Sequence, residues 1–249
     1  MASSVVGTIE PRLRLSEIER AARKPTESLD AYDLFLRALS EGQKPDPERR
    51  TAAIELAHRA LAIDPSYAPA AALIGAVRAS QARDGIPITD SDIDDALRLV
   101  RRALDAGRDD PDVLWRSGQV LAMLAGEHAA ALNAIDRALT LNPNSAPSWA
   151  SSAIVNCYAN RPDAAILAIQ RAMQLSPLDP LAYAFKFVLA YAMMLAGRYE
   201  EALEWVDRSL HDRSSNHAAI RGKVALCGYL GRTEEARKWV RRRSTPTRR

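Results

Sequence analysis

Few side chains in this sequence could form a metal site or a catalytic centre. The four histidines are His58, His128, His211 and His217. A zinc site needs several His, Cys, Asp or Glu ligands that converge on one point. None of these histidines has such a partner at a matching helical spacing on an identifiable face. We therefore predict no metal site and assign the histidines to solvated or structural positions.

The other reactive groups also have simple structural interpretations. Cys157 and Cys227 lie 70 positions apart in apolar stretches without a basic neighbour that would lower a thiol pKa, which predicts buried, reduced thiols. The paired glutamates of YEEALEW and TEEARKW stand at expected helix starts, where negative charge complements the helix dipole. The sequence has no glycine-rich phosphate loop and no serine nucleophile elbow. We predict no cofactor and no enzymatic activity.

The bulk composition indicates a folded protein whose excess positive charge lies at one end. Hydrophobic residues make up 47% of the chain, and no apolar run reaches the roughly 18 residues that cross a bilayer. Seven of the 34 basic residues fall in the last thirteen positions, which leaves 27 basic against 31 acidic residues elsewhere. Because the N-terminus does not resemble a secretory signal, we expect a cytoplasmic protein without a membrane span.

The positions of the large and small side chains repeat along the chain. Trp115 and Trp149 are 34 residues apart, and so are Trp205 and Trp239. The same interval separates two pairs of small residues, Ala131 from Ala165 and Ala138 from Ala172. A fixed period of this length is typical of stacked helical hairpins.

Within each period the sequence predicts two helices joined by a tight turn. The apolar spacing of DVLWRSGQVLAMLAG ends at Gly126, and Asn160 takes the corresponding place one unit later. Glycine and asparagine both tolerate the left-handed conformation that ends a helix. The second helix of the unit stops before Pro143, because the residue ahead of a proline avoids the helical conformation.

This pattern resembles the tetratricopeptide repeat (TPR). The resemblance implies an all-α, right-handed superhelical solenoid of about six helix-turn-helix repeats. The expected organisation is an N-terminal helical segment at residues 1–25, a repeat domain at 26–243 and a basic tail at 244–249. The expected units cover residues 26–65, 66–110, 112–143, 146–177, 178–214 and 216–243.

Some stretches resemble a narrower group of TPR regions. TESLDAYDLFLRALS, ALNAIDRALTLNPNSAPSWA, AIQRAMQLSPLDPLAYAF and LAGRYEEALEW are similar to the helical region that follows the catalytic part of bacterial class III adenylate/guanylate cyclases or the DNA-binding part of winged-helix transcriptional regulators. The resemblance implies a bacterial protein in a signalling context. Because the sequence contains neither a cyclase sheet nor a winged helix, no catalytic residue is carried over. The two open hypotheses are a protein-binding scaffold and a detached regulatory fragment of such a cyclase or regulator.

The concave face of such a solenoid is the surface on which we expect a peptide or partner helix to bind. The repeat pattern assigns eight side chains to this groove: Arg116, Val120, Tyr158, Phe187, Tyr191, Met194, Arg221 and Tyr229. Packing between helices is an equal alternative for each aromatic residue. The first two units supply mostly alanine there, so affinity is expected to come from the C-terminal half.

The C-terminal end raises two further questions about partners. Three interpretations of the basic tail are open. It could keep the end of the stack soluble, make non-specific contacts with the phosphates of nucleic acid or lipid, or be an altered end without function. Apart from this tail, we expect no nucleic-acid binding. Trp239 and Val240 have no following helix to cover them, so this face is also a candidate homodimer contact.

Overall fold

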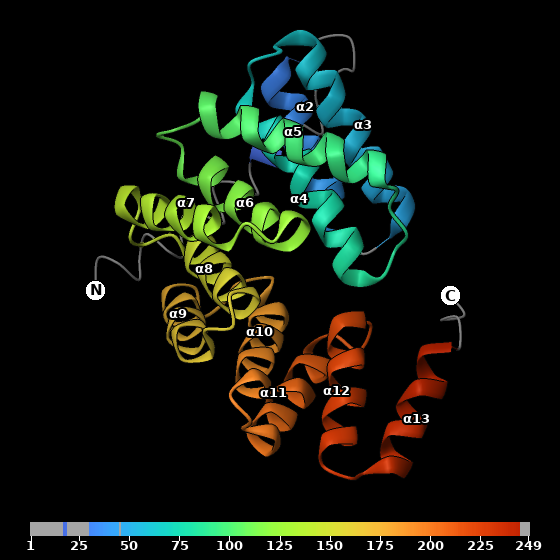
Figure 1. The fold of residues 1–249 in the computed structure, drawn as a ribbon. Helices are drawn as coiled ribbons and strands as arrows, with labels where there is room; N and C mark the ends of the chain where they lie inside the picture. The colour runs from blue at the N-terminus through green and yellow to red at the C-terminus, as the bar shows by residue number, and fades with distance from the viewer. Residues whose placement is uncertain (1–16, 19–29, 45, 245–249) are drawn as a thin grey trace.

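The computed structural model describes residues 17–18, 30–44 and 46–244, and these residues form helices without a β-strand. The helices follow one another in six pairs along the chain (Figure 1). In order, they are α2 (Ala31–Gly42) and α3 (Pro47–Ile63), α4 (Ala68–Asp84) and α5 (Asp90–Ala106), α6 (Pro111–Val120) and α7 (His128–Leu141), α8 (Ala146–Tyr158) and α9 (Pro162–Leu175), α10 (Ala182–Leu195) and α11 (Tyr199–Asp212), and α12 (His217–Tyr229) and α13 (Thr233–Ser244). A π-helical turn, η2 (Leu121–Ala125), extends α6. The prediction of an all-α repeat fold is confirmed.

The turns inside the pairs have a common local cause. In five pairs, a residue with a positive φ follows the first helix directly or after one intervening residue. These residues are Gly85, Gly126, Asn160, Gly197 and Gly231. In this left-handed conformation the chain leaves the helix and turns back at once. Asn160, with φ 54°, is the one non-glycine residue of this kind among the described residues. The predicted roles of Gly126 and Asn160 are confirmed.

Several helix starts are stabilised by side chains that accept hydrogen bonds from backbone N–H groups. Asp46 Oδ1 accepts from the amides of Glu48 and Arg49 at 2.9 and 3.3 Å. Ser145 Oγ and Asn216 Oδ1 do the same one residue before α8 and α12. Such caps satisfy amides that have no partner within the helix. They therefore help to fix where α3, α8 and α12 begin, whereas α4, α7, α9, α10 and α11 have no side-chain cap.

Small residues allow the pairs to stack closely. Ala131, Ala138, Ala165 and Ala172 in the second helices are fully buried, with 0% exposure. Each second helix from α3 to α11 contacts its own first helix and also the first helix of the next pair. Neighbouring first helices contact each other as well. The first helices thus form one continuous layer, and an elongated core follows the chain instead of closing into a single centre.

The stack curves far enough for its two halves to meet. The first helix α12 contacts α4, and Figure 1 shows the end of α4 facing the start of α12. Since α4 and α12 are both first helices, the curvature turns that layer inward. We call this side the concave face.

The two ends of the chain lie largely outside the described residues. The expected N-terminal segment is described only at Glu17 and Ile18, and Tyr32 Oη donates to Glu17 Oε2 at 2.9 Å. Residues 245–249 of the expected basic tail are not described. At the end of the stack, Trp239 is half-buried while Val240 is 49% exposed, so the homodimer contact stays a prediction. None of the described helices has the length and apolarity that crossing a membrane requires.

Candidate functional site

The histidines and cysteines do not assemble a reactive centre in the described part of the chain. His58, His211 and His217 are exposed, and no group of three or more His, Cys, Asp or Glu side chains there could hold a metal ion. Cys157 and Cys227 are buried, as predicted. Burial raises the pKa of Cys157 to about 12, so its reactive thiolate form is negligible at neutral pH.

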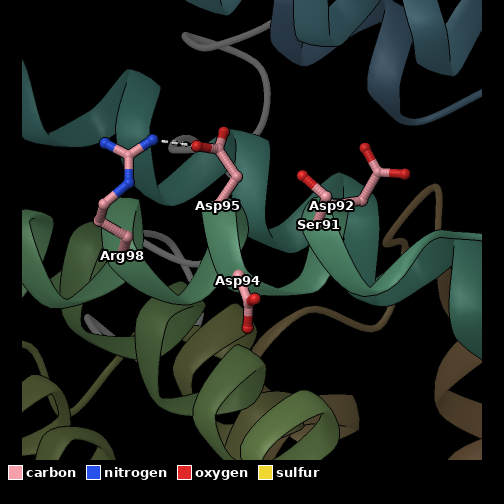
Figure 2. Close-up of a pocket in the computed structure, with 5 residues that line it drawn as sticks. All are labelled: Ser91, Asp92, Asp94, Asp95 and Arg98. Atoms are coloured by element: carbon pink, nitrogen blue, oxygen red, sulfur yellow. Dashed lines mark hydrogen bonds and ion pairs between the residues drawn. The ribbon is translucent and has the colours of Figure 1, made fainter.

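The acidic depression on α5 is accounted for by helix capping and ion pairing. Ser91, Asp92, Asp94, Asp95 and Arg98 line it (Figure 2). Asp92 Oδ2 accepts from the backbone amide and the hydroxyl of Thr89, and its other oxygen pairs with Arg78 at 2.6 Å.

The bonds from Thr89 hold the pKa of Asp92 below its usual range. Asp95 pairs with Arg98. These contacts stabilise the start of α5 and engage the carboxylates of Asp92 and Asp95.

Two of the side chains predicted to line the groove lie inside the stack instead. Val120 is fully buried at 0% exposure. A Cβ on Gly75 of α4 would lie 3.4 Å from Val120 Cγ2, so the absence of a side chain there lets α6 approach α4 and places Val120 between the two helices. Arg116 is 3% exposed. Its guanidinium lies 4.3 Å from the Trp115 ring centre and donates to the Asp112 carbonyl at 3.0 Å. Neither side chain is accessible to a ligand.

Three of the predicted aromatic residues lie together on the concave face. Phe187 and Tyr191 of α10 stack with ring centres 6.3 Å apart and an interplanar angle of 18°. A Cβ on Gly222 of α12 would meet Phe187 Cε2 at 2.9 Å, so the Phe187 ring reaches the surface of α12. Tyr158, at the end of α8, is 39% exposed, and burial together with the nearby Tyr158 phenol raises the pKa of Tyr191. We call Tyr158, Phe187 and Tyr191 the aromatic cluster.

Met194 and Tyr229 lie differently relative to this cluster. Met194 is half-buried and packs on the C-terminal core with Phe187 and Tyr191. Tyr229 is 64% exposed at the far end of α12, where its ring stacks on that of Tyr199 at 4.8 Å and 3°. Tyr229 therefore belongs to the turn before α13, at the edge of the predicted surface.

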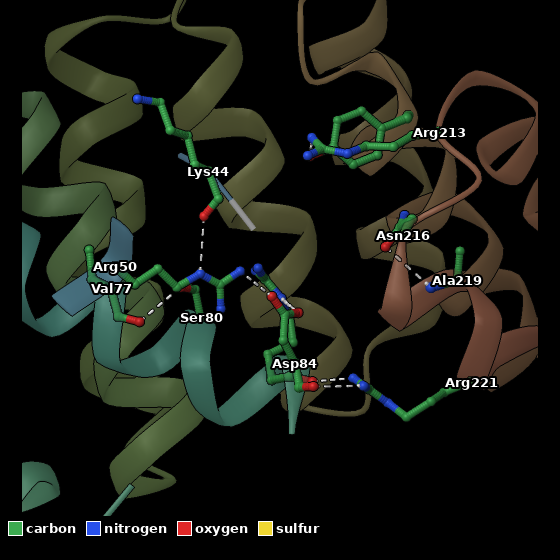
Figure 3. Close-up of polar contacts among 11 residues, drawn as sticks. Lys44, Arg50, Val77, Ser80, Asp84, Arg213, Asn216, Ala219 and Arg221 are labelled. Carbon is green, nitrogen blue, oxygen red and sulfur yellow. Dashed lines mark hydrogen bonds and ion pairs between the residues drawn. The ribbon is translucent and has the colours of Figure 1, made fainter. Parts of the chain in front are cut away.

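Arg221 joins the two halves of the solenoid. Its Nη1 donates to the backbone oxygen of Asp84 at 3.1 Å, and its Nη2 donates to that of Arg83. These carbonyls end α4, so the guanidinium caps that helix from α12. Figure 3 shows Arg50, Asp84 and Arg221 converging at this point. Of the predicted groove residues, Arg221 is thus held at the junction between α4 and α12.

The polar residues that surround this junction were not foreseen from the sequence. Arg50 of α3 is 5% exposed and pairs with Asp84 Oδ2 at 2.5 Å, while Arg83 Nε lies 3.3 Å from Asp84 Oδ1. Burial favours the neutral form of Asp84, but Arg83 and Arg50 outweigh burial and hold its pKa below the usual range. We call Arg50, Arg83 and Arg221, gathered around Asp84, the arginine cluster.

The arginine cluster and the aromatic cluster adjoin one another. Burial raises the pKa of Tyr158, and the nearby charges of Arg83 and Arg221 partly oppose that rise. Phe187 of the aromatic cluster also reaches Gly222, the chain neighbour of Arg221. The concave face thus combines partly exposed aromatic rings with guanidinium groups from both halves of the chain.

Comparisons with known proteins agree with this architecture. The model for the tetratricopeptide repeat matches residues 89–146 and 157–219. The fold is a TPR-type solenoid. TPR-fold proteins are generally non-enzymatic and generally mediate protein–protein interaction. The sequence matches no curated protein, and the matches do not support an association with cyclases or winged-helix regulators.

Several solved structures share the solenoid at low sequence identity. TTC0263, a thermophilic TPR protein of Thermus thermophilus, is 18% identical with a TM-score of 0.59, over 80% of this chain and 98% of that one. PilF of Pseudomonas aeruginosa is 18% identical with a TM-score of 0.53, over 84% of this chain and 88% of that one. Human IFIT1, solved as a dimer with m7Gppp-AAAA, is 13% identical with a TM-score of 0.71, over 86% of this chain and 50% of its own. Similarity at this level establishes the fold alone.

Proposed function

We propose that this solenoid is a cytoplasmic, non-enzymatic scaffold that binds a peptide or partner helix on its concave face. The observation that carries the proposal is the partly exposed aromatic cluster, built by α8 and α10 and continued onto α12. Rigid aromatic rings supply a large contact area with little loss of conformational entropy and dominate many protein interfaces. Met194 and Arg221 border the cluster, and Tyr229 lies at the edge of the predicted surface, stacked on Tyr199.

A regulatory setting belongs to the same proposal. It rests on the resemblance of the sequence to TPR regions of bacterial cyclases and winged-helix regulators. An upstream reading frame that encodes either domain would favour a regulatory fragment over an independent scaffold.

Affinity capture with the purified chain tests the scaffold proposal. Tyr191→Ala removes a half-buried ring from the centre of the aromatic cluster, whereas Tyr229→Ala removes an exposed ring from its edge. We expect the partner to be lost with Tyr191→Ala and retained with Tyr229→Ala. If both variants capture the same proteins in the same amounts as the wild type, the proposed surface is wrong. Circular dichroism of both variants controls for unfolding.

A further inference from the structure

The last described helix, α13, differs from the second helix before it at positions which that helix buries. The interval of 34 residues relates Leu203 and Val206 of α11 to Arg237 and Val240 of α13. In α11 the two residues are buried, at 5% and 1% exposure. In α13, Arg237 is exposed and Val240 is 49% exposed. The outer surface of α13 is therefore largely polar, as in a helix that faces solvent at the end of a stack.

The same comparison shows a change in the sign of the charge on this surface. The interval of 34 residues relates Glu204 and Asp207 of α11 to Lys238 and Arg241 of α13. All four residues are exposed. Solubility is served by surface charges of both signs. It therefore does not explain why positions that are acidic in one second helix are basic in the next.

Positive charge is concentrated in α13 and in the residues that follow it. Residues 233–249 include seven basic and two acidic residues, a net charge of +5. Both acids, Glu234 and Glu235, stand in the first turn of α13. Of the 34 basic and 31 acidic residues of the whole chain, 27 and 29 fall in residues 1–232, a net charge of −2. The net charges therefore attract a polyanion to this end of the solenoid and not to the rest of the chain.

One side of α13 is anchored on the protein, and the basic side is exposed. Ala236 and Trp239 pack on the C-terminal core, and Lys223 Nζ lies 4.8 Å from the Trp239 ring centre. Lys238 and Arg241 are exposed and stand three positions apart, so they are neighbours on the helix surface. Figure 1 shows α13 as the outermost helix of the C-terminal half. The helix thus holds its cations in a row on an accessible surface.

We infer that α13 and the basic residues after it bind the phosphate backbone of a nucleic acid. This surface is additional to the concave face of the proposed function. A nucleic acid carries closely spaced negative charges along a line, and lysines and arginines gain affinity by displacing its counterions. Six of the seven basic residues in this segment are arginines, which can pair with a phosphate through two parallel hydrogen bonds. Because phosphate contacts carry no sequence information, we expect binding without sequence preference.

An anionic membrane matches this helix less well than a nucleic acid does. A helix that lies in a membrane surface inserts an apolar face between the lipids, in addition to the attraction of its charges. In α13, Ala236 and Trp239 pack on the protein core. Val240 is the one exposed apolar residue among the described residues of this helix. The surface therefore offers charge without an apolar face, which is what a phosphate backbone requires.

Fluorescence anisotropy with the purified full chain tests this inference. The labelled probes are a short duplex DNA and a single-stranded RNA, which distinguish the two sources of a phosphate backbone. We expect the logarithm of the binding constant to fall linearly with the logarithm of the salt concentration. The slope should be about −0.9 per phosphate contacted for the duplex and about −0.7 for the single strand. Absence of binding to both probes at low salt, or binding that salt does not weaken, would overturn the inference without any change in the protein.

Double variants of the protein locate the contact. Lys238→Gln/Arg241→Gln removes two charges from α13 and is expected to weaken binding about tenfold or more at low salt, and to flatten the salt slope for the duplex by about two. Arg59→Gln/Arg171→Gln removes two charges from exposed positions of α3 and α9, and we expect it to bind like the wild type. Equal weakening by both variants would show that net charge alone attracts the probe, which would overturn the inference. Circular dichroism confirms that both variants are folded.

Two further results would assign the binding elsewhere. Phosphatidylserine vesicles that bind more tightly than either nucleic acid, and are released by Lys238→Gln/Arg241→Gln, would make α13 a membrane contact and overturn the inference. Nucleic-acid binding that is lost with Tyr191→Ala but kept by the α13 variant would place the ligand on the concave face and overturn it as well. The capture of a protein partner, which tests the proposed function, is a separate measurement and can succeed or fail independently.

Discussion

Arg221 and Asp84 lie 137 positions apart in the sequence, yet Arg221 Nη1 donates to the Asp84 backbone oxygen at 3.1 Å. In a solenoid most contacts join neighbouring repeats, so a contact between the second and the sixth pair depends on the curvature of the whole stack. The bond therefore fixes the distance between the two halves.

We expect Arg221→Ala to open the solenoid. Hydrogen bonds from a charged donor contribute about 1.5–3 kcal/mol each in net stability, and the substitution removes two. Small-angle X-ray scattering is expected to show a larger maximum dimension, while circular dichroism keeps its helical signal. The matched control is Arg59→Ala at an exposed position of α3. Identical scattering from all three proteins would show that the contact does not hold the halves together.

Asp84 is expected to make stability depend on pH. Its pKa is lower in the folded protein than its ordinary value of 3.8, so its contribution is present above that value and is lost as the pH falls through the folded pKa. Asp84→Asn leaves the buried Arg50 without its charged partner, which is expected to cost about 3 kcal/mol at neutral pH. Urea unfolding at neutral pH and at about pH 3 measures both effects. The variant should lose less stability on acidification than the wild type, and equal losses would contradict the assignment.

The turns and small residues of the repeat could be predicted because each depends on local chemistry. Gly126 and Asn160 adopt the left-handed conformation that their residue types tolerate. Ala131 and Ala165 are fully buried because only small side chains let the helices approach. A fixed period makes such features visible without knowledge of the three-dimensional structure.

The concave surface could be predicted only in part, because it depends on how the helices rotate as they stack. The aromatic residues of α8 and α10 lie on it, whereas Val120 is buried where α6 approaches α4 at Gly75. The repeat pattern assigns no role to Arg50, which pairs with Asp84 of the next helix, or to Arg221, which caps α4. The contact of Arg221 depends on the superhelical curvature, which sums small rotations over several pairs.

Alanine substitutions at two glycines distinguish the effect of backbone strain on stability from that of helix propensity. Gly126 has φ 68°, and a Cβ added to it would have no neighbour within 4 Å; Gly228 in α12 is equally open but lacks a positive φ. Gly126→Ala is expected to destabilise the protein by about 1 kcal/mol, because an L-residue is strained in the left-handed region. Gly228→Ala is expected to stabilise it by about 0.5–1 kcal/mol, because alanine favours the helix. Thermal unfolding monitored by circular dichroism should show a lower melting temperature for Gly126→Ala and a higher one for Gly228→Ala. Melting temperatures that change in the same direction would refute this explanation.

Leucine substitutions test the continuous core. Leu189 of α10 is 1% exposed and Leu167 of α9 is 69% exposed. We expect Leu189→Ala to cost about 2–5 kcal/mol, the usual range for emptying a buried leucine site. Leu167→Ala should stay within about 0.5 kcal/mol of the wild type. Urea denaturation measures both, and similar losses for the two variants would mean that α10 is not part of the core.

Lys223 is expected to hold the last helix in place. Its side chain is 8% exposed and contacts Asp207 of α11, Glu235 of α13 at 3.2 Å and the face of the Trp239 ring at 4.8 Å. Burial lowers the pKa of Lys223, but the two carboxylates outweigh burial and raise it above its ordinary value, so the ammonium group stays charged at neutral pH.

Lys223→Met keeps most of the apolar stem and removes this charge. Amide exchange in α13 is expected to accelerate on the order of tenfold, because a terminal helix that loses its anchor opens more often. Lys238→Met provides the control, since Lys238 is exposed on the same helix. Unchanged exchange in Lys223→Met would show that apolar packing of Ala236 and Trp239 on the C-terminal core is sufficient to hold α13.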